Sequence, residues 1–387
     1  MILCTLGRQP KLGLAELESL FGADAVHSLG NQAALLDIPS TAINHRRLGG
    51  AIKVAKLITT LPGINWMDAM RASKDYLLRN LATVPEGKIK LGLSVYGLKV
   101  NSKQLQTSGL ELKKLIKSAG RSVRVVPNTA PELGSAQVLH NQLASPLGIE
   151  LLLIAHEGQT YLAQTLSVQD IDDYTKRDFG RPKRDAFVGM LPPKLAQTML
   201  NLAQVQTGER VLDPFCGTGV VLQEAALLGC AVYGTDLNER MVSYSQDNLD
   251  WLAANYQLQI NKQLETADAT NATWTSPLQH VVCETYLGQP LSGLPRPEKL
   301  EEIRRDCQTI IRKFLKNLRP QLESGTRCCI AVPAWRVGNR FVHLPLVDDL
   351  KEIGYNRVSF EHAGNNDLLY HRADQIVARE VLVLTVT

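Results

Sequence analysis

From residue 190 onward, short apolar runs alternate with segments of helical periodicity, and this alternation constrains the fold more than any other feature of the chain. The strand-like runs include 211-VLDPF-215, 231-AVYGTD-236 and 280-HVVCE-284, and helix-like segments separate them. Strands that alternate with helices are typical of a mostly parallel sheet covered by helices on both faces. Residues 190–387 are therefore predicted to form a doubly wound α/β domain, with its ligand at the carboxyl ends of the strands.

The upstream part of the chain lacks this regular alternation and mixes strands with helices. We expect a small α+β module over residues 1–63 and a second α+β domain over residues 64–165, which ends in a strand–turn–strand hairpin. Residues 166–189 are charged and rich in turn formers, which predicts a linker or an extended loop. A chain of 387 residues is long enough for about two or three such domains.

Charge and cysteine usage exclude some classes of protein. A formal net charge of +4 is too small to predict nucleic-acid binding, although one domain can still carry a local basic surface. The seven cysteines include no CxxC pair, so we expect buried, reduced thiols and neither a disulfide framework nor a metal site. Early charges argue against a secretory signal, and no uncharged apolar run reaches the roughly 18 residues of a membrane helix, so we expect a cytoplasmic protein.

Acidic and glycine residues follow successive strands of the predicted sheet. The first strand is followed by Gly217 and Gly219, whose bare backbone lets a ligand approach the main chain beside Asp213. Asp236 ends the second strand and is placed to accept hydrogen bonds from ribose hydroxyls, and Asp268, after the third, is placed to accept from an adenine amine. No Lys or Arg occurs between Asp213 and Asp236, which disfavours a phosphate ligand. An acidic loop suits S-adenosylmethionine, which carries an ammonium and a sulfonium group.

Each of these residues alone has an ordinary structural explanation. Gly217 and Gly219 could be plain turn glycines. Asp236 or Asp268 could cap a helix or a turn. The order and spacing of the whole set favour a cofactor site.

The stretch DPFCGTGVVLQEA, followed by GTD and DAT, resembles the S-adenosylmethionine-binding motifs of the class I methyltransferases. Together with LGRQPKLGLAELESLFG, RVVPNTAPELGSAQVLHNQL and RDFGRPKRDAFVGMLPPKLAQTMLNLA, it most closely resembles the tRNA guanosine-10 N2-methyltransferase group, which carries an N-terminal THUMP domain. The resemblance covers nearly the whole chain and is weakest at residues 40–90. It implies a ferredoxin-like module over 1–63, a THUMP-like RNA-binding domain over 64–165 and a Rossmann-like methyltransferase domain over 190–387.

The resemblance also implies S-adenosylmethionine as the cofactor and tRNA as the substrate, methylated at the N2 atom of a guanosine. It identifies no accessory subunit. Pro192, Lys194 and Leu195 would line the methionine end of the cofactor. The complete predicted cofactor site comprises Asp213, Phe215, Gly217, Gly219, Asp236, Leu237, Asp268, Ala269 and Pro192.

The turn after the fourth strand departs from the family pattern. Methyltransferases that act on exocyclic amines commonly carry a D-P-P-Y-type turn there, whose acid and a backbone carbonyl accept the amine protons while the aromatic ring stacks on the base. In 284-ETYLG-288, Glu284 stands at the position of the acid, and Thr285 and Tyr286 replace both prolines. Leu287 replaces the aromatic residue. We predict Glu284 and Tyr286 as the catalytic residues, with Tyr286 stacking on the base from one position earlier.

Three interpretations of this turn stay open. The protein is a methyltransferase in which Glu284 and Tyr286 perform these roles, or it methylates a different atom or nucleotide, or it is a non-catalytic RNA-binding protein that retains the fold. The complete acid–glycine set favours the first two. In a purely structural interpretation, Glu284 caps the next turn and Tyr286 packs in the core.

Basic residues gather in two places where RNA contacts are predicted. Five cations lie within residues 113–124, and on charge alone a solvated helix face would explain them as well as RNA binding; the THUMP resemblance favours RNA. In 176-KRDFGRPKRD-185, cations and acids are interleaved, which predicts a mixture of salt bridges and RNA contacts. The predicted RNA-binding residues are Lys113, Lys114, Lys117, Arg121, Arg124, Arg181 and Arg184.

Overall fold

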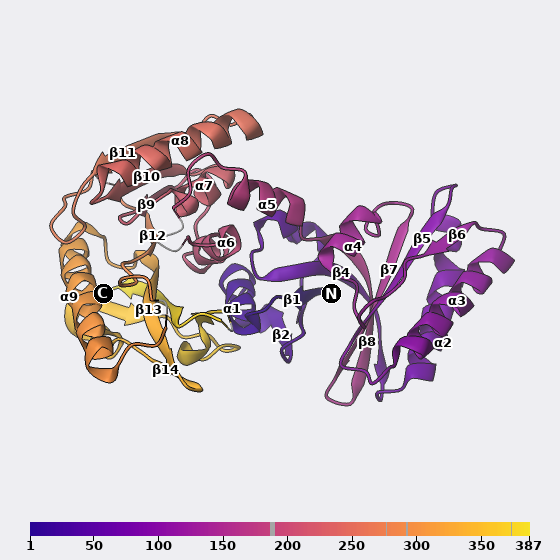
Figure 1. Ribbon diagram of the computed structural model, residues 1–387. Helices are drawn as coiled ribbons and strands as arrows, with labels where there is room; N and C mark the ends of the chain where they lie inside the picture. The colour runs from indigo at the N-terminus through magenta and orange to yellow at the C-terminus, as the bar shows by residue number, and fades with distance from the viewer. Residues whose placement is uncertain (186–189, 276, 292, 373) are drawn as a thin grey trace. The chain divides into compact units, whose positions relative to one another are not determined.

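The chain folds into two compact units in the computed structural model, which describes residues 1–185, 190–275, 277–291, 293–372 and 374–387 (Figure 1). The N-terminal unit contains residues 1–14, 24–46 and 50–173. The C-terminal unit contains residues 174–387 together with two short upstream segments, residues 15–23 and 47–49.

The N-terminal unit is built on one mixed sheet. Its strands lie in the order β2-β3-β1-β4-β8-β7-β5-β6. Their bounds are β1 Ile2–Leu6, β2 Val26–Leu29, β3 Ala33–Leu36, β4 Ala51–Pro62, β5 Ile89–Tyr96, β6 Val123–Val125, β7 Gly148–His156 and β8 Gln159–Val168. The long strand β4 pairs with β1 on one side and β8 on the other, so strands of both predicted upstream domains share the sheet. The division at residues 63 and 64 stays a prediction.

Two amphipathic helices of this unit pack on a shared core. Helix α2 (Trp66–Asn80) begins after Asn65 and helix α3 (Ser102–Ser118) after Asn101; each of these asparagines accepts a hydrogen bond from a backbone N–H of the first turn. The buried face of α3 is formed by Leu105, Ser108, Gly109, Leu112 and Ile116. Leu110, in contrast, is 54% exposed. Helix α1 (Pro10–Phe21) and the short helix α4 (Ser135–His140) complete the upstream helices.

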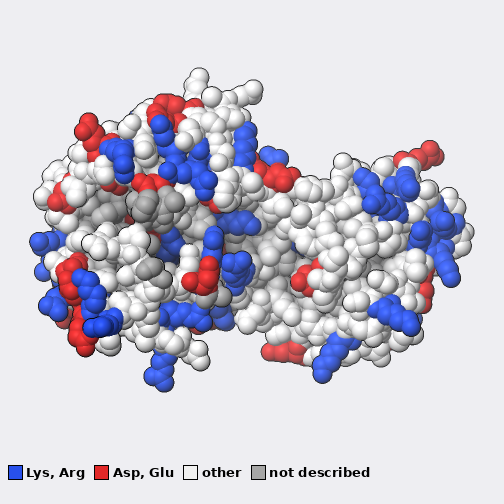
Figure 2. Space-filling model, in the orientation of Figure 1, with Lys and Arg blue, Asp and Glu red and all other residues white. Residues whose placement is uncertain are grey.

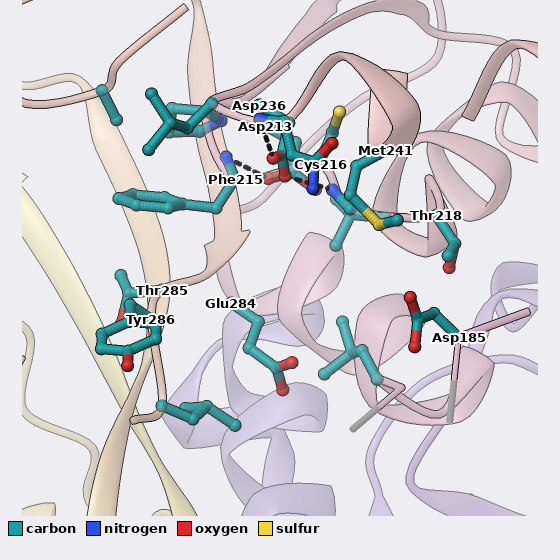
Figure 3. Close-up of a pocket in the computed structure, with 18 of the residues that line it drawn as sticks. Asp185, Asp213, Phe215, Cys216, Thr218, Asp236, Met241, Glu284, Thr285 and Tyr286 are labelled. Atoms are coloured by element: carbon teal, nitrogen blue, oxygen red, sulfur yellow. Dashed lines mark hydrogen bonds between the residues drawn. The ribbon is translucent and has the colours of Figure 1, made fainter. Parts of the chain in front are cut away.

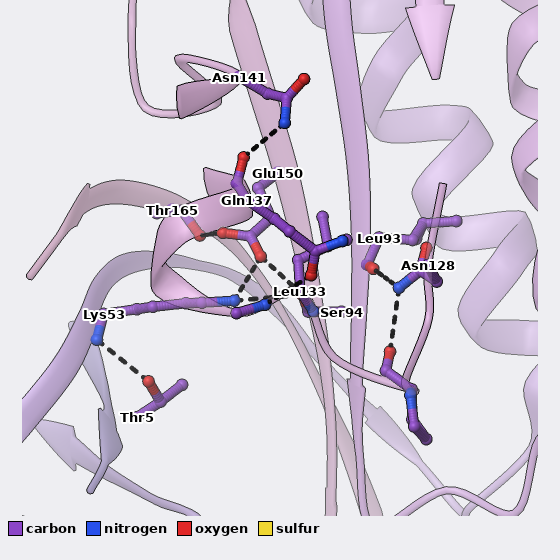
Figure 4. A network of polar contacts seen from close by, with 12 residues as sticks. Thr5, Lys53, Leu93, Ser94, Asn128, Leu133, Gln137, Asn141, Glu150 and Thr165 are labelled. Atoms are coloured by element: carbon purple, nitrogen blue, oxygen red, sulfur yellow. Dashed lines mark hydrogen bonds and ion pairs between the residues drawn. The ribbon is translucent and has the colours of Figure 1, made fainter. Parts of the chain in front are cut away.

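A buried polar network crosses the N-terminal sheet (Figure 4). Nζ of Lys53 on β4 lies 2.5 Å from Oε1 of Glu150 on β7, and both side chains are almost completely buried. The Oγ atom of Ser94 donates to the same oxygen at 2.6 Å, while Thr165 donates to Oε2 at 2.6 Å. Ser94 also accepts from the backbone N–H of Leu133 at 2.9 Å. Every oxygen of the Glu150 carboxylate is therefore occupied within the fold.

Part of the passage 166–189, where a linker or an extended loop was predicted, is helical. Helix α5 (Ile171–Phe179) lies within this passage, and Nε of its buried Arg177 donates to Oε1 of Glu224 at 2.7 Å. The charges of this passage are thus partly used in tertiary contacts. Residues 186–189, at the end of the passage, lie outside the described residues.

The C-terminal unit has a second, mostly parallel sheet in the order β11-β10-β9-β12-β13-β17-β15. Its strands are β9 Arg210–Asp213, β10 Ala231–Asp236, β11 Lys262–Thr266, β12 His280–Glu284, β13 Arg327–Val337, β14 Arg340–Val342, β15 Tyr355–Arg357, β16 Leu369–Tyr370 and β17 Val377–Val386. Its helices are α6 Pro193–Leu202, α7 Val220–Leu227, α8 Glu239–Tyr256 and α9 Pro297–Leu318.

The topology of this sheet confirms the predicted α/β architecture and its switch point. Strands β9 to β13 pair in parallel, and β10 and β12 flank β9 on opposite sides. Their carboxyl ends therefore meet at one edge beside the centre of the sheet, where such folds bind ligands. Strand β17 runs antiparallel to β13. The main core of the unit packs α9 against the sheet through residues such as Phe314 and Leu315.

The two upstream segments bind to the C-terminal unit through buried polar groups. The side chain of Asn201 on α6 donates to Oε1 of Glu16 at 2.8 Å, and its carbonyl oxygen accepts from Nε of Arg47 at 2.8 Å. Glu16 also accepts from the backbone N–H of Gly49 at 2.9 Å. Residues far apart in the sequence thus complete one unit.

Two further expectations concern the state of the cysteines and the presence of membrane helices. All seven cysteines are buried and carry free thiols. Among the described residues, none of the helices is both long and apolar enough to cross a membrane.

Candidate active site

A cavity of about 690 Å³ opens at the carboxyl ends of β9, β10 and β12 in the C-terminal unit (Figure 3). It is where the sequence analysis expected the ligand. The predicted residues that line it are Asp213, Phe215, Gly217, Asp236, Leu237, Asp268, Ala269, Glu284 and Tyr286. Gly219 and Pro192 are not among its described lining residues.

Asp213, the last residue of β9, is the most enclosed acid of the pocket. It is 2% exposed, and its Oδ1 accepts from the backbone N–H of Phe215 at 3.1 Å. Burial raises the pKa of Asp213 well above its ordinary value, and the nearby charges of Asp236 and Glu284 raise it further. The described residues offer it no ion pair with a cation, so a positively charged ligand would stabilise its ionised form.

Asp236, the last residue of β10, holds the glycine loop in place. Its Oδ2 accepts from the backbone N–H of Gly217 at 3.0 Å, and its Oδ1 accepts from that of Asn238 at 2.9 Å. Burial raises the pKa of Asp236, while these two hydrogen bonds oppose the shift. Each carboxylate oxygen keeps a second lone pair that a ligand hydroxyl can use.

The two glycines of the loop have different surroundings. Both have positive φ angles, +50° at Gly217 and +79° at Gly219. A Cβ atom at Gly217 would meet nothing closer than the carbonyl oxygen of Phe215, 3.9 Å away, whereas one at Gly219 would lie 2.8 Å from Oγ of Ser245. Gly217 therefore leaves open space at the pocket, and Gly219 instead permits close packing of α7 on α8.

The third strand end supplies the rim of the pocket. Oδ1 of Asp268 accepts from both the backbone N–H and the hydroxyl of Thr270, at 2.9 and 2.8 Å. Ala269 is buried beside it, and Leu237 is largely exposed. Phe215 packs edge-on against Phe314 with ring centroids 5.0 Å apart, so it joins the pocket to the core.

The pocket is strongly acidic. Five carboxyl groups line it, and its described lining residues include no Lys, Arg or His. The acids are Asp185, Asp213, Asp236, Asp268 and Glu284. Such a site disfavours phosphate and fits a nucleoside with a cationic end, because the carboxylates would otherwise repel one another. The residues present thus fit S-adenosylmethionine.

Described residues before α6 form one wall of the pocket, and for residues 176–185 of this region a mixture of salt bridges and RNA contacts was expected. Asp185, Met190 and Leu191 line the cavity. Lys183, two residues before Asp185, is held on α8 because the side chain of Asn248 accepts from its backbone N–H at 2.9 Å and donates to its carbonyl at 3.0 Å. Pro192 caps the start of α6 directly after this wall.

Glu284, at the end of β12, points its carboxyl group into the pocket (Figure 3). Its Oε1 accepts from Nε of Arg379, a buried residue of β17. Burial raises the pKa of Glu284, and the charge and hydrogen bond of Arg379 oppose that shift. Within the described part of the chain, Oε2 has no hydrogen-bond partner. Sequence reasoning missed Arg379, although charged residues within a mostly apolar strand are a signal of pairing.

The turn after Glu284 is held by hydrogen bonds. The backbone N–H and the hydroxyl of Thr285 both donate to the carbonyl of Ala331, at 2.9 and 3.0 Å. Tyr286 lines the pocket and is 38% exposed, so its ring is accessible to a flat ligand and is not a core residue. Leu287 and Gly288 continue the same wall.

The predicted RNA-binding residues of the N-terminal unit differ in availability. Lys114, Lys117 and Arg124 are exposed, and Lys113 is half-buried. Figure 2 shows Lys and Arg side chains over the region of α3 and β6. Arg121 uses its guanidinium within the fold, because Nη1 donates to the carbonyls of Leu81 and Val84 at 3.0 Å each.

The two residues of the C-terminal unit that were predicted to contact RNA also differ in exposure. Arg184 is exposed, and its guanidinium lies 4.8 Å from the ring centroid of Phe179. Arg181 is only 3% exposed, and its Nη2 contacts the sulfur of Met190 at 3.1 Å. The expectation that Arg181 contacts RNA is therefore corrected: in this structure its guanidinium lies inside the protein, where a phosphate does not reach it.

Comparison with known proteins identifies the domain type. Residues 181–345 match the family described as RMKL-like, methyltransferase domain. The chain is 34% identical over 155 residues to a tRNA (guanine(10)-N2)-dimethyltransferase of Methanothermobacter thermautotrophicus, covering 40% of this chain and 42% of that protein. The chain thus spans less than half the length of this relative.

Solved structures support the fold over the full chain. The crystal structure of TrmN from Thermus thermophilus is similar with a TM-score of 0.53 at 18% identity, covering 100% of this chain and 99% of that one. SMU.472, a proposed methyltransferase complexed with SAH, is similar with a TM-score of 0.51 at 12% identity over 99% and 96% of the two chains. The C-terminal unit therefore has the Rossmann-like methyltransferase fold.

Proposed function

We propose that this chain is an S-adenosylmethionine-dependent methyltransferase that acts on the N2 amine of a guanosine in tRNA. The observation that carries the proposal is the acidic pocket at the carboxyl ends of β9, β10 and β12, whose described lining residues include no cation. The methyltransferase-domain match and the name of the archaeal relative support the same reaction. The cytoplasmic location expected from the sequence belongs to this proposal.

The cofactor supplies an electrophilic methyl group. Asp213 would attract its cationic methionine end, because that residue is buried and has no cation of its own in the described structure. Asp236 would accept from the ribose hydroxyls with its remaining lone pairs. Asp268 would accept from the adenine amine, and Gly217 would let the ligand lie close to the main chain.

Glu284 and Tyr286 would prepare the amine for reaction. The lone pair of guanine N2 is delocalised into the ring, so the amine is a poor nucleophile. Oε2 of Glu284 would accept one amine proton and Tyr286 would stack on the base, which together orient the lone pair. The nitrogen that has gained a methyl group must lose one proton, and Glu284 offers a carboxylate oxygen to receive it before solvent does.

The N-terminal unit would bind tRNA. Its exposed cations Lys114, Lys117 and Arg124 lie on or just after α3, where they are available to phosphates. A guanosine must leave its stack to enter the pocket, so recognition of tRNA shape by a separate unit is consistent with such chemistry. The THUMP-like character of this unit is part of the proposal.

Methyl transfer to RNA tests the proposal directly. Wild-type protein is incubated with total tRNA and S-adenosylmethionine labelled in the methyl group, and the nucleosides are separated after digestion. We expect label in N2-methylguanosine, and none with Glu284→Ala. Label in another nucleoside would correct the substrate atom, and the absence of transfer to any RNA would contradict the proposal.

A non-catalytic RNA-binding protein is the competing candidate, because the prolines of the D-P-P-Y turn are absent and Glu284 is already ion-paired. Calorimetry separates the two candidates. Binding of S-adenosylmethionine that is weakened by Asp236→Ala would support the enzyme. Heat-silent mixing together with retained tRNA binding would support the non-catalytic protein.

A further inference from the structure

We propose that Arg379 is a positioning residue for methyl transfer: its guanidinium fixes Glu284 so that one carboxylate oxygen is held and the other is left for the substrate amine. The inference rests on the proposed function and deepens it. In this proposal, an ion pair between two strands restrains the site, as the prolines of a D-P-P-Y turn do through the backbone.

The register of the sheet brings the two side chains together. Glu284 of β12 pairs with Ala331 of β13, and Arg379 of β17 pairs with Pro333 on the other side of β13. Ala331 and Pro333 are two residues apart, so all four side chains lie on the same face of the sheet. Because the side chains on β13 are short, the long side chains of Glu284 and Arg379 can meet above that strand.

The backbone of the turn is fixed by a different contact from that of a proline turn. Thr285 donates its N–H to Ala331 and so extends the β12–β13 ladder beyond Glu284. A proline at this position would have no N–H and could not form the bond. The Thr285 hydroxyl reinforces the same acceptor. The backbone at Glu284 is therefore anchored, and the remaining freedom of its side chain is restricted by Arg379.

The charge of Arg379 favours the protonation state that the reaction needs. Burial raises the pKa of Glu284, and the groups that face it are Arg379 from β17, Asp213 from β9 and Cys283 on its own strand. Of these, Arg379 alone favours the ionised carboxylate. A protonated Glu284 would offer a hydroxyl to the amine in place of an acceptor.

Arg379 also contacts a second residue of the pocket wall. Its Nη2 donates to the carbonyl oxygen of Met190 at 3.4 Å, and Met190 lines the cavity just before α6. One guanidinium thus connects Glu284 with Met190. Its loss would disturb the placement of the substrate acceptor more than the bound nucleoside, since Asp213 ends β9, Asp236 ends β10 and Asp268 follows β11.

The variant Arg379→Gln tests this role. We expect kcat for methyl transfer to tRNA to fall about 10²-fold, as for other small losses of alignment. The acidic limb of the pH–rate profile should move to higher pH, because Glu284 loses the cation that favours its ionised form. The Kd for S-adenosylmethionine, measured by calorimetry, should stay near the wild-type value. An unchanged kcat and an unchanged acidic limb would overturn the proposal.

A second readout does not depend on turnover. With glutamate labelled by ¹³C at its carboxyl, the NMR titration of Glu284, assigned by its loss in Glu284→Gln, should shift to higher pH in Arg379→Gln. An unchanged titration overturns the positioning role alone. If the wild-type protein transfers no methyl group while this titration shifts, the proposed function has failed, and the positioning role fails with it.

Two further variants separate positioning from stability. Arg379→Lys keeps the charge but not the planar fork, so its acidic limb should stay near wild type while kcat falls; wild-type kcat would overturn the proposal even if Arg379→Gln did not fold. Arg357→Gln is the matched control. Arg357 lies on β15, and its Nη2 lies 3.2 Å from Oε1 of Glu380, the neighbour of Arg379 on β17. This variant should lower stability without moving the acidic limb, and an equal movement would count against the proposal.

Discussion

Two carboxylates, the buried Glu150 in the N-terminal unit and the partly buried Glu284 in the C-terminal unit, are each paired with a cation from another strand. Glu150 is enclosed on all sides, with Lys53 and Ser94 on one oxygen and Thr165 on the other. Glu284 has one oxygen held and the other without a partner in the described structure, beside a cavity. An ion pair of this kind therefore stabilises the fold when both carboxylate oxygens have hydrogen-bond partners. It can also bind a ligand when one of the two oxygens has none.

The largest effect should come from breaking the enclosed pair. Lys53→Met would leave Glu150 charged and unpaired in the core, which we expect to lower the free energy of unfolding by about 3–5 kcal/mol. Urea unfolding followed by circular dichroism measures the loss. The double variant Lys53→Met/Glu150→Gln should recover most of it, because the amide keeps the hydroxyl contacts without the charge. A double variant as unstable as the single one would show that packing, not charge, dominates there.

The next effect separates the two glutamates by activity. Glu284→Gln should lower kcat about 10²-fold with little change in cofactor Kd, because an amide is a weaker acceptor and cannot take a proton. Glu150→Gln is the matched substitution, and per folded molecule it should leave kcat unchanged. Single-turnover methyl transfer measures both variants. Equal losses in the two variants would remove the distinction between a saturated and an open pair.

Asp213 extends the comparison to a buried acid whose cation would be the ligand. The pKa of Asp213 is raised in the folded protein. Protonated Asp213 therefore stabilises the ligand-free protein at low pH, and this stabilisation is lost as the pH rises through the raised pKa. A cationic nucleoside lowers the pKa again. Binding should therefore release protons below the raised pKa, and affinity should increase with pH across that window.

Calorimetry in buffers of different ionisation enthalpy measures this proton release. Asp213→Asn should weaken binding about tenfold, which is about 1.4 kcal/mol, and should reduce the release. The raised pKa values of Asp236 and Glu284 contribute in the same direction, so some release should remain. A variant that binds and releases protons as wild type does would place the cation elsewhere in the pocket.

The last contrast lies within the glycine loop. Gly219→Ala combines a positive φ with a Cβ only 2.8 Å from Ser245, so it should cost stability by about 1–2 kcal/mol or more. Gly217→Ala carries the φ strain without the clash, and it should weaken cofactor binding more than it lowers the melting temperature. Thermal unfolding with and without ligand distinguishes them. Identical behaviour of the two variants would show that both glycines serve the fold alone.

The strand ends of the site could be predicted because parallel strands place their carboxyl ends along one edge. This reasoning located Asp213, Asp236 and Glu284 without knowledge of any contact. It could not find Arg379, which lies 95 residues after Glu284 on an antiparallel strand, because periodicity does not say which strand lies beside β13. It also placed Gly219 at the ligand, although spacing alone cannot distinguish a glycine that faces a cavity from one that packs against a helix.

The charged passage after β8 shows what local composition could not decide. The interleaved charges of residues 176–185 predicted a mixture of salt bridges and RNA contacts, and in the structure Arg177 is buried against Glu224 and Arg181 is buried beside Met190. Tertiary partners at large sequence separation decide whether such side chains are solvated. The same limit applies to Arg121, whose donors are used by backbone carbonyls of residues 81 and 84.

The participation of residues 15–23 and 47–49 in the C-terminal unit has a consequence for synthesis and dissection of the protein. Glu16 leaves the ribosome long before its partner Asn201, which follows 185 residues later, so their hydrogen bond can form only late in synthesis. A gene fragment that starts at residue 174 would leave the amide of Asn201 facing an empty slot where Glu16 and Arg47 belong. Such a fragment should fold incompletely, and adding the first fifty residues as a separate polypeptide should restore part of its stability.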